Sequence, residues 1–117
     1  MAPIDLLLVA LGTFPTAKGV MFLVPTISVE LIEAHQAFHR RLSGVGVHSM
    51  PYYKPGNWVP HCTAAMDLAL DKLSPAMEVC RNSSTFGRVR LSAAGLVSVG
   101  PTQELYTFPV TGDGACK

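Results

Sequence analysis

One helical stripe constrains the fold of this chain more than any other feature of its sequence. Apolar residues recur four, three, four and four positions apart, at Ile27, Leu31, Ala34, Phe38 and Leu42. This is the spacing of one face of an α-helix. Thr26 or Ser28 can cap its start, and Gly44 follows its end. The sequence therefore predicts an amphipathic helix that covers part of a core built from other elements.

Five segments have the length, apolar content and flanking turn residues of β-strands. They cover residues 4–11, 20–24, 59–66, 88–99 and 104–110. A turn at 13–19 separates the first two, so we expect a hairpin there. A second helix is expected within 72–82, with Ser74 as its cap and Pro75 in its first turn. Together these elements predict an α+β fold with an antiparallel sheet and two helices on one face.

The length of 117 residues predicts one domain. We expect this domain to span residues 1–110 and a frayed tail to cover 111–117. The net charge of +1 excludes a broad basic surface for non-specific nucleic-acid binding, so any RNA contact has to be local. Hydrophobic residues make up 49% of the chain and charged residues 15%. We therefore expect some apolar surface to meet a partner chain.

The cysteines and the N-terminus bear on the location of the protein. Cys62, Cys80 and Cys116 are an odd number without C-x-x-C spacing. They indicate reduced thiols in a cytoplasmic protein, with a Cys62–Cys80 disulfide as the alternative. The first apolar run has no basic residue before it and is interrupted by Asp5, which favours a buried strand over a signal segment. No apolar run approaches the length of a membrane span, so no membrane contact is expected.

The segment from Trp58 to Thr63 carries the most informative chemistry of the chain. His61 and Thr63 lie two positions apart on an expected strand, so their side chains share one face. An imidazole can move a proton near neutral pH, and a hydroxyl can hold a phosphoryl oxygen. A loop at 43–57, rich in Gly, Ser and Pro, precedes the strand and could supply substrate contacts. A structural histidine and threonine without catalytic roles are the alternative interpretation.

On these residues the chain resembles the two-histidine phosphoesterases, the superfamily of 2'-5' RNA ligase-like proteins and RNA cyclic phosphodiesterases. The matching segments are Leu11–Pro15, the helix at Leu31–Leu42, the run Tyr53–Thr63, and Glu104–Pro109. The family pattern has two H-x-[ST]-apolar motifs, one in each of two pseudo-symmetric lobes, and this sequence has one. Ala64 also stands where a larger apolar residue is usual. The chain thus resembles a single lobe, the C-terminal half.

The resemblance implies a phosphodiesterase that acts on a 2',3'-cyclic phosphate or a 2'-5' linkage of RNA or nucleotides, with no cofactor. His61 would be the general acid or base and Thr63 would hold phosphate, so the partner is an RNA terminus or nucleotide phosphate. A second histidine could come from an upstream segment, from His61 of another copy, or from nowhere. We expect a homodimer, because a two-fold pair of lobes would copy the pseudo-symmetry of the family fold.

Other interpretations remain beside this one. A degenerate half-site would make the chain a non-catalytic nucleotide- or RNA-binding or assembly module. His35 and His39, four apart on the helix, could ligate a metal, although no further ligand is evident and we expect no metal site. A substrate wall, on which a base stacks and to which phosphate is attracted, could be formed by Tyr52, Tyr53, Lys54 and Trp58. Alternatively, Trp58 packs under the loop and Lys54 is solvated. Arg88 and Arg90 share a strand face that could reach phosphate or face solvent.

Overall fold

A computed structural model of the protein describes residues 3–98 and 103–109. The chain divides into two compact units. The larger unit runs from Leu7 to Arg88, and the smaller one combines the chain up to Leu6 with the part from Val89 onward. Both helices lie in the larger unit. The expected tail at 111–117 lies outside the described residues, and the single lobe at 1–110 stays a prediction.

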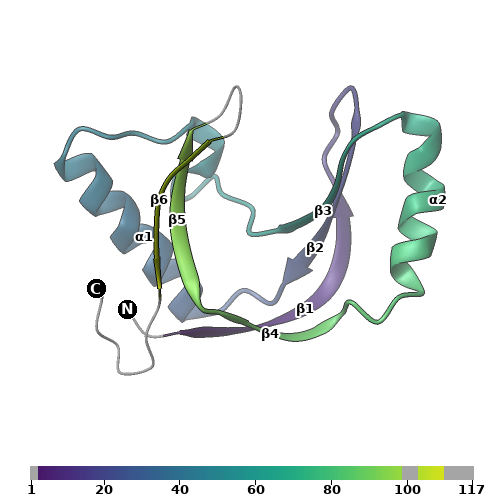
Figure 1. Ribbon diagram of the computed structural model, residues 1–117, viewed down its shortest axis with the longest axis horizontal. Helices are drawn as coiled ribbons and strands as arrows, with labels where there is room; N and C mark the ends of the chain where they lie inside the picture. The colour runs from purple at the N-terminus through teal and green to yellow at the C-terminus, as the bar shows by residue number, and fades with distance from the viewer. Residues whose placement is uncertain (1–2, 99–102, 110–117) are drawn as a thin grey trace. The chain divides into compact units, whose positions relative to one another are not determined.

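The strands form one four-stranded sheet in the order β3-β2-β1-β4 and one two-stranded sheet (Figure 1). The four strands are β1 (Ile4–Thr13), β2 (Gly19–Pro25), β3 (Cys62–Leu68) and β4 (Gly87–Leu91). β2 pairs antiparallel with both β1 and β3, so the expected hairpin is present. The second sheet pairs β5 (Ala93–Ser98) antiparallel with β6 (Gln103–Pro109). With helices α1 (Val29–Gly44) and α2 (Leu70–Arg81), this confirms the predicted α+β class.

Two strands differ from their expected bounds. The segment expected as one strand at 88–99 forms β4 and β5, which belong to different sheets, with Ser92 between them. β3 begins at Cys62 rather than at Val59. The reason is Pro60, which has no N–H group to donate to a neighbouring strand, so regular pairing starts only beyond it.

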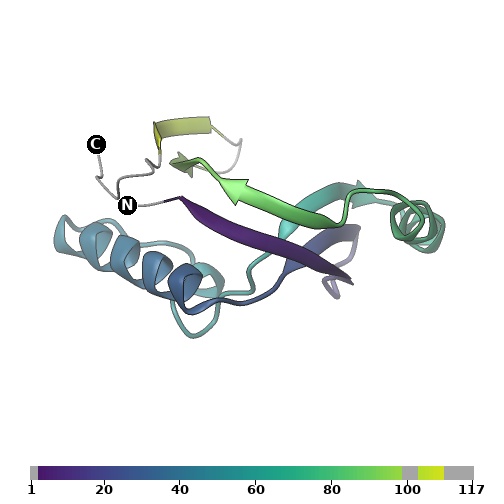
Figure 2. The same ribbon diagram turned by 90° about the horizontal axis from the view of Figure 1, so that it is seen from below.

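Helix α1 follows the apolar stripe of the sequence from Leu31 to Leu42, and its N-cap is Ser28. Ile27, expected as the first residue of the stripe, lies before the helix and is 54% exposed. The backbone N–H of Leu31 donates to Ser28 Oγ at 3.2 Å. At the other end, the N–H groups of Val45 and Val47 both donate to the carbonyl of Leu42, at 3.1 and 2.9 Å. A backbone N–H group at the start of the helix and a backbone carbonyl at its end thus have hydrogen-bond partners close by in the sequence. Figure 2 shows α1 along its length and α2 end-on, so the two axes are not parallel.

Helix α2 begins earlier than expected, and the predicted cap at Ser74 is wrong. The helix starts at Leu70, follows Ala69 without a side-chain cap, and contains Pro75 in its interior. Leu73 explains the early start, because it packs against the core and is therefore held in the helix. Pro75 has no N–H for the carbonyl of Asp71, but both residues are exposed, so water can satisfy that carbonyl.

The core of the larger unit lies between α2 and β2. Its buried members are Leu8, Met21, Leu23 and Cys80, and its partly buried members are Leu11, Ala65, Leu73, Ala76, Met77 and Phe86. Successive side chains of a strand point to opposite faces of the sheet. Phe22 therefore points away from this core, between Met21 and Leu23, and is nevertheless only 4% exposed. The contacts of Phe22 with Phe14 and His61 form a second packed region of the unit.

Candidate functional site

His61 lies at the wall of a pocket of about 490 Å³ in the larger unit. The pocket is lined by Phe14, Pro15, Thr16, Tyr52, Tyr53, Asn57, Val59 and His61. These residues come from the turn between β1 and β2, from the loop that contains the short 3₁₀ helix η1 (Pro51–Tyr53), and from the segment before β3. The volume lies within the range of about 300–1,000 Å³ that is usual for small-molecule sites. The lining is mainly aromatic and apolar, and His61 is its one histidine.

Strand pairing brings these distant segments together. Since β2 lies between β1 and β3, the turn that joins β1 to β2 lies close to the start of β3. Leu23 pairs with Cys62 in this arrangement, and Phe22 pairs with Gly12 on the other side. A Cβ atom on Gly12 would lie 2.5 Å from Cε2 of Phe22. Glycine at this position therefore allows the Phe22 ring to lie over β1 and to reach His61.

The ring of His61 is held by two phenylalanines. Its centroid lies 5.2 Å from that of Phe14, with the planes at 86°, and 5.2 Å from that of Phe22, with the planes at 58°. The two phenylalanine rings are 4.4 Å apart. Edge-on and tilted contacts at such distances are favourable between aromatic rings. His61 is therefore half-buried and fixed in orientation while still lining the pocket.

The hydrogen bond of His61 fixes which of its nitrogens is available for chemistry. Nδ1 lies 2.6 Å from the backbone carbonyl oxygen of Val59. A carbonyl oxygen only accepts, so Nδ1 carries the hydrogen and donates it, a tautomer that we assign from the partner. The lone pair of the neutral ring is then on Nε2. His61 can accept a proton at Nε2 when neutral and donate one from the same atom when charged.

Thr63 lies on the same sheet face as His61 but outside the pocket lining. It pairs with Phe22 across the β2–β3 ladder, and directly opposite residues of an antiparallel pair share a face. The ring of Phe22 contacts His61, so Thr63 belongs to this face. Its side chain is exposed. The next strand residue back, Cys62, is a free and exposed thiol opposite Leu23.

The four expected substrate-wall residues lie in different places. Tyr52 and Tyr53 line the His61 pocket, whereas Lys54 lines a second pocket nearer α1. Trp58 lines neither one and stacks on His35, with centroids 3.7 Å apart and planes at 8°. Burial, and next the charge of His39, lower the pKa of His35, while a hydrogen bond to the Tyr53 backbone opposes this. His35 of α1 therefore contacts both ends of the loop segment 53–58, Tyr53 through a hydrogen bond and Trp58 through ring stacking.

Several residues of the pocket were not foreseen from the sequence. Phe14, Pro15 and Thr16 enter it from the hairpin turn, and Asn57 enters it from the loop. Asn57 also donates from Nδ2 to the carbonyl of Pro51 at 3.2 Å, which closes the loop on itself. A sequence signal for the turn residues existed, because a hairpin that pairs with the His61 strand has to place its turn near that strand.

Two further pairs of candidate residues lie outside the lining of the His61 pocket, namely Arg88 with Arg90 and His35 with His39. In the smaller unit, Arg90 Nε donates to Asp5 Oδ1 at 2.8 Å, and Nη2 lies 3.3 Å from Oδ2. Arg88 is exposed. The rings of His35 and His39 are 4.3 Å apart. Within residues 3–98 and 103–109, no group of three or more His, Cys, Asp or Glu side chains is arranged to hold a metal ion.

The fold and the position of His61 can now be compared with the resemblance found in the sequence. The α+β fold places a histidine directly before strand β3 and a threonine two residues on, as we expected for a two-histidine phosphoesterase. A model of the family described as the 2'-5' RNA ligase superfamily matches residues 1–101, so the chain belongs to this superfamily. Searches of curated proteins and of solved structures gave no significant match. In the described part of the chain, no helix is long and apolar enough to cross a membrane.

Proposed function

We propose that the protein is a phosphodiesterase of RNA or nucleotides that acts on a 2',3'-cyclic phosphate or a 2'-5' linkage. The observation that carries the proposal is the state of His61: it lines a pocket of about 490 Å³ while Nδ1 is engaged by the Val59 carbonyl. Membership of the 2'-5' RNA ligase superfamily supports RNA or nucleotides as the substrate class. The free thiols of Cys62 and Cys80 suit the cytoplasmic location that we propose for this activity.

In the proposed reaction, His61 exchanges a proton with the substrate through Nε2. In-line displacement at phosphorus needs one group to activate the attacking oxygen and one to protonate the leaving oxygen. The Val59 carbonyl holds the ring so that Nε2, rather than Nδ1, faces this task. The Thr63 hydroxyl, on the same face, donates a hydrogen bond to a phosphoryl oxygen.

The substrate base is assigned to the aromatic side of the pocket. Tyr52 and Tyr53 lie at this side with ring centroids 4.6 Å apart, and a nucleobase can stack on such rings. Lys54 attracts phosphate from the adjacent loop position. Trp58 supports the substrate wall indirectly, because its stack on His35 fixes the loop that carries the two tyrosines.

The second histidine is assigned to another copy of the chain. The printed sequence has one H-x-T motif, and a two-fold dimer would bring two His61 side chains to one site. A test is to mix the wild type with an inactive His61 variant in equal amounts and allow subunits to exchange. A shared site leaves about one quarter of the activity per total protein, since only wild-type pairs are complete, whereas independent sites leave about one half. A monomer in light scattering at micromolar concentration would exclude the shared site.

The activity itself is tested with a 2',3'-cyclic nucleotide and two substitutions of His61. His61→Ala should lower kcat/KM at least about a hundredfold, as expected for loss of an acid–base group. His61→Asn is the sharper variant, because the asparagine amide can still donate to the Val59 carbonyl but has no counterpart of Nε2. It should lose as much activity as His61→Ala while unfolding at nearly the wild-type urea concentration.

A matched pair of threonine variants tests the phosphate ligand. Thr63→Val should lower kcat/KM by about tenfold, the effect of one lost hydrogen bond to a charged group. Thr26→Val replaces an exposed threonine before α1 and should leave activity unchanged.

Turnover at the background rate by the wild type and by both His61 variants would refute the proposal. That result would favour the nucleotide-binding or assembly module, an alternative that the single H-x-T motif keeps open.

A further inference from the structure

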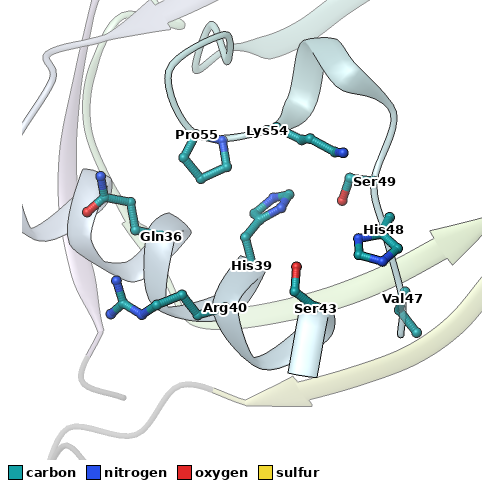
Figure 3. Close-up of a pocket in the computed structure, with 9 residues that line it drawn as sticks. All are labelled: Gln36, His39, Arg40, Ser43, Val47, His48, Ser49, Lys54 and Pro55. Atoms are coloured by element: carbon teal, nitrogen blue, oxygen red, sulfur yellow. The ribbon is translucent and has the colours of Figure 1, made fainter. Parts of the chain in front are cut away.

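A second pocket, of about 480 Å³, lies between α1 and the segment that follows it. It is lined by Gln36, His39, Arg40, Ser43, Val47, His48, Ser49, Lys54 and Pro55 (Figure 3). None of these nine residues is acidic, and His61 is not among them. The pocket is thus separate in its lining from the site of the proposed hydrolysis, and nothing in that reaction uses its residues apart from Lys54.

The pocket collects positive charge and hydrogen-bond donors from three parts of the larger unit. Helix α1 contributes His39 and Arg40, the segment after it contributes His48, and the loop contributes Lys54. Figure 3 shows the His39 ring pointing into the middle of the pocket, while the Lys54 chain extends across it toward Ser49. Guanidinium and ammonium groups only donate, and imidazole N–H and hydroxyl groups can donate as well. Such a set matches an anion that has several acceptor oxygens.

Among residues 3–98 and 103–109, no ion pair between these cations and an acidic side chain is formed that would compete with a ligand. The ion pairs formed within the described ranges involve Arg81 with Glu78 and Arg90 with Asp5. Arg40 and Lys54 are in neither pair, and both are exposed. The local charge of the pocket is therefore available to an anion from solution.

The end of α1 lies beside the pocket and would by itself oppose an anion, because the C-terminus of a helix carries partial negative charge. This effect arises from carbonyl groups that lack partners. Here the carbonyl of Leu42 accepts from Val45 and Val47, and that of Ser43 accepts from the N–H of Gly46 at 3.1 Å. With these carbonyls engaged, the formal charges of the side chains dominate the electrostatics of the pocket.

The wall that carries His39 is rigidly supported. The His39 ring lies 4.3 Å from that of His35, which stacks in turn on Trp58. On the opposite side, the Lys54 N–H donates to the carbonyl of Pro51 at 3.2 Å, and the N–H of Asn57 donates to the Lys54 carbonyl at 3.0 Å. The His39 ring and the backbone at Lys54 are thus held before a ligand arrives, which reduces the entropy that these groups lose on binding.

From this arrangement we propose that the second pocket binds the phosphate group of a nucleoside monophosphate. A phosphomonoester is the anion that fits best, since it offers three terminal oxygens to the ring, hydroxyl and cationic donors. The volume also exceeds what phosphate alone would fill and leaves space for a sugar. Because its lining omits His61, binding here does not depend on whether the chain hydrolyses a diester.

The ring-proton NMR signals of the four histidines can report where a ligand binds. Inorganic phosphate, adenosine 5'-monophosphate and adenosine are titrated separately into the full chain, and the ring-proton NMR signals of the histidines are followed at one fixed pH. Phosphate and the monophosphate should shift the signals of His39 and His48, whereas adenosine should leave both signals in place. Any shift of the His61 signal reports separately on the pocket of the proposed hydrolysis. Signals are assigned by substituting each histidine in turn.

Two substitutions test the source of the affinity. Lys54→Gln should weaken binding of the monophosphate about tenfold, as expected for one lost charge-assisted bond. Lys72→Gln removes an exposed lysine of α2 with the same change of net charge and should leave the affinity unchanged. Added sodium chloride should weaken binding to the wild type more than to Lys54→Gln.

Three outcomes would overturn the inference. The first is the absence of any shift of His39 and His48 with phosphate or the monophosphate. The second is equal binding of adenosine and its monophosphate, which would show that the base rather than the phosphate is recognised. The third is an equal loss of affinity for the monophosphate in Lys54→Gln and Lys72→Gln, which would show that only the net charge of the protein matters. None of these depends on diester hydrolysis, so this inference and the proposed function can fail separately.

Discussion

Gly12→Ala tests the packing that holds His61. The added Cβ would lie 2.5 Å from Cε2 and 2.8 Å from Cζ of Phe22. Carbon atoms in contact are normally about 3.5–4.0 Å apart, so the ring has to move by about 1 Å. It has little room, because Phe22 is 4% exposed and its ring contacts those of Phe14 and His61. Overpacking of this kind costs about 1–3 kcal/mol.

The assay is equilibrium unfolding in urea, with Gly44→Ala as the matched control. Gly44 is the last residue of α1, and a Cβ there would have no atom within 4 Å. Gly44→Ala should therefore stabilise the protein by about 0.4–1 kcal/mol, because alanine has less freedom to lose on folding. Gly12→Ala should destabilise it by about 1–3 kcal/mol and also lower activity, since movement of Phe22 displaces His61.

Repeating Gly12→Ala in a Phe22→Leu protein tests whether the loss of stability arises from contact with the Phe22 ring. Leucine lacks the Cε2 and Cζ atoms of phenylalanine, so Phe22→Leu removes the two closest contacts of the added methyl group. In that background the cost of Gly12→Ala should shrink by about 1 kcal/mol or more, a coupling typical of residues in contact. The reasoning is refuted if Gly12→Ala costs less than about 0.5 kcal/mol, or if its cost is the same in both backgrounds.

Three further predictions concern stability. Ser28→Ala should cost about 1 kcal/mol by removing the acceptor of the Leu31 N–H, and an unchanged urea midpoint would contradict the assigned cap. Leu23→Ala should cost about 2–5 kcal/mol, whereas truncation of the 43% exposed Leu7 should cost far less; similar losses would show that the core is misplaced. The pKa of His35 is lowered in the folded protein, so the unfolded chain binds the proton of this residue more tightly. The contribution of His35 to stability is therefore complete above about pH 6.5 and is lost as the pH falls through the lowered folded-state pKa. His35→Gln should make the urea midpoint fall less steeply with decreasing pH in this range, and an unchanged fall would exclude His35 as its cause.

The sequence predicted features that depend on neighbours along the chain. The α1 stripe and the choice between Thr26 and Ser28 as its cap are set within a few residues, and the structure selects Ser28. His61 was singled out in the same way, because the H-x-T spacing and the residues before it are local. The family model confirms the resemblance built on that motif.

Features set by distant contacts could not be predicted in this way. Ser74 was expected to cap α2, but packing of Leu73 against the core extends the helix past it. Phe14 joins His61 only because β2 pairs with both β1 and β3. The basic pocket likewise needs α1 and the loop to face each other, and the spacing of His35 and His39 had suggested only a possible metal site.

The loop around η1 faces both pockets with successive residues, since Tyr53 lines one and Lys54 lines the other. A ligand in either pocket therefore acts on the same short piece of backbone. If one ligand favours a particular conformation of this piece, the affinity of the opposite pocket changes by some factor, and thermodynamic reciprocity requires the same factor in the reverse direction. The peptide bond that joins Tyr53 to Lys54 is thus one direct covalent connection between the linings of the two pockets.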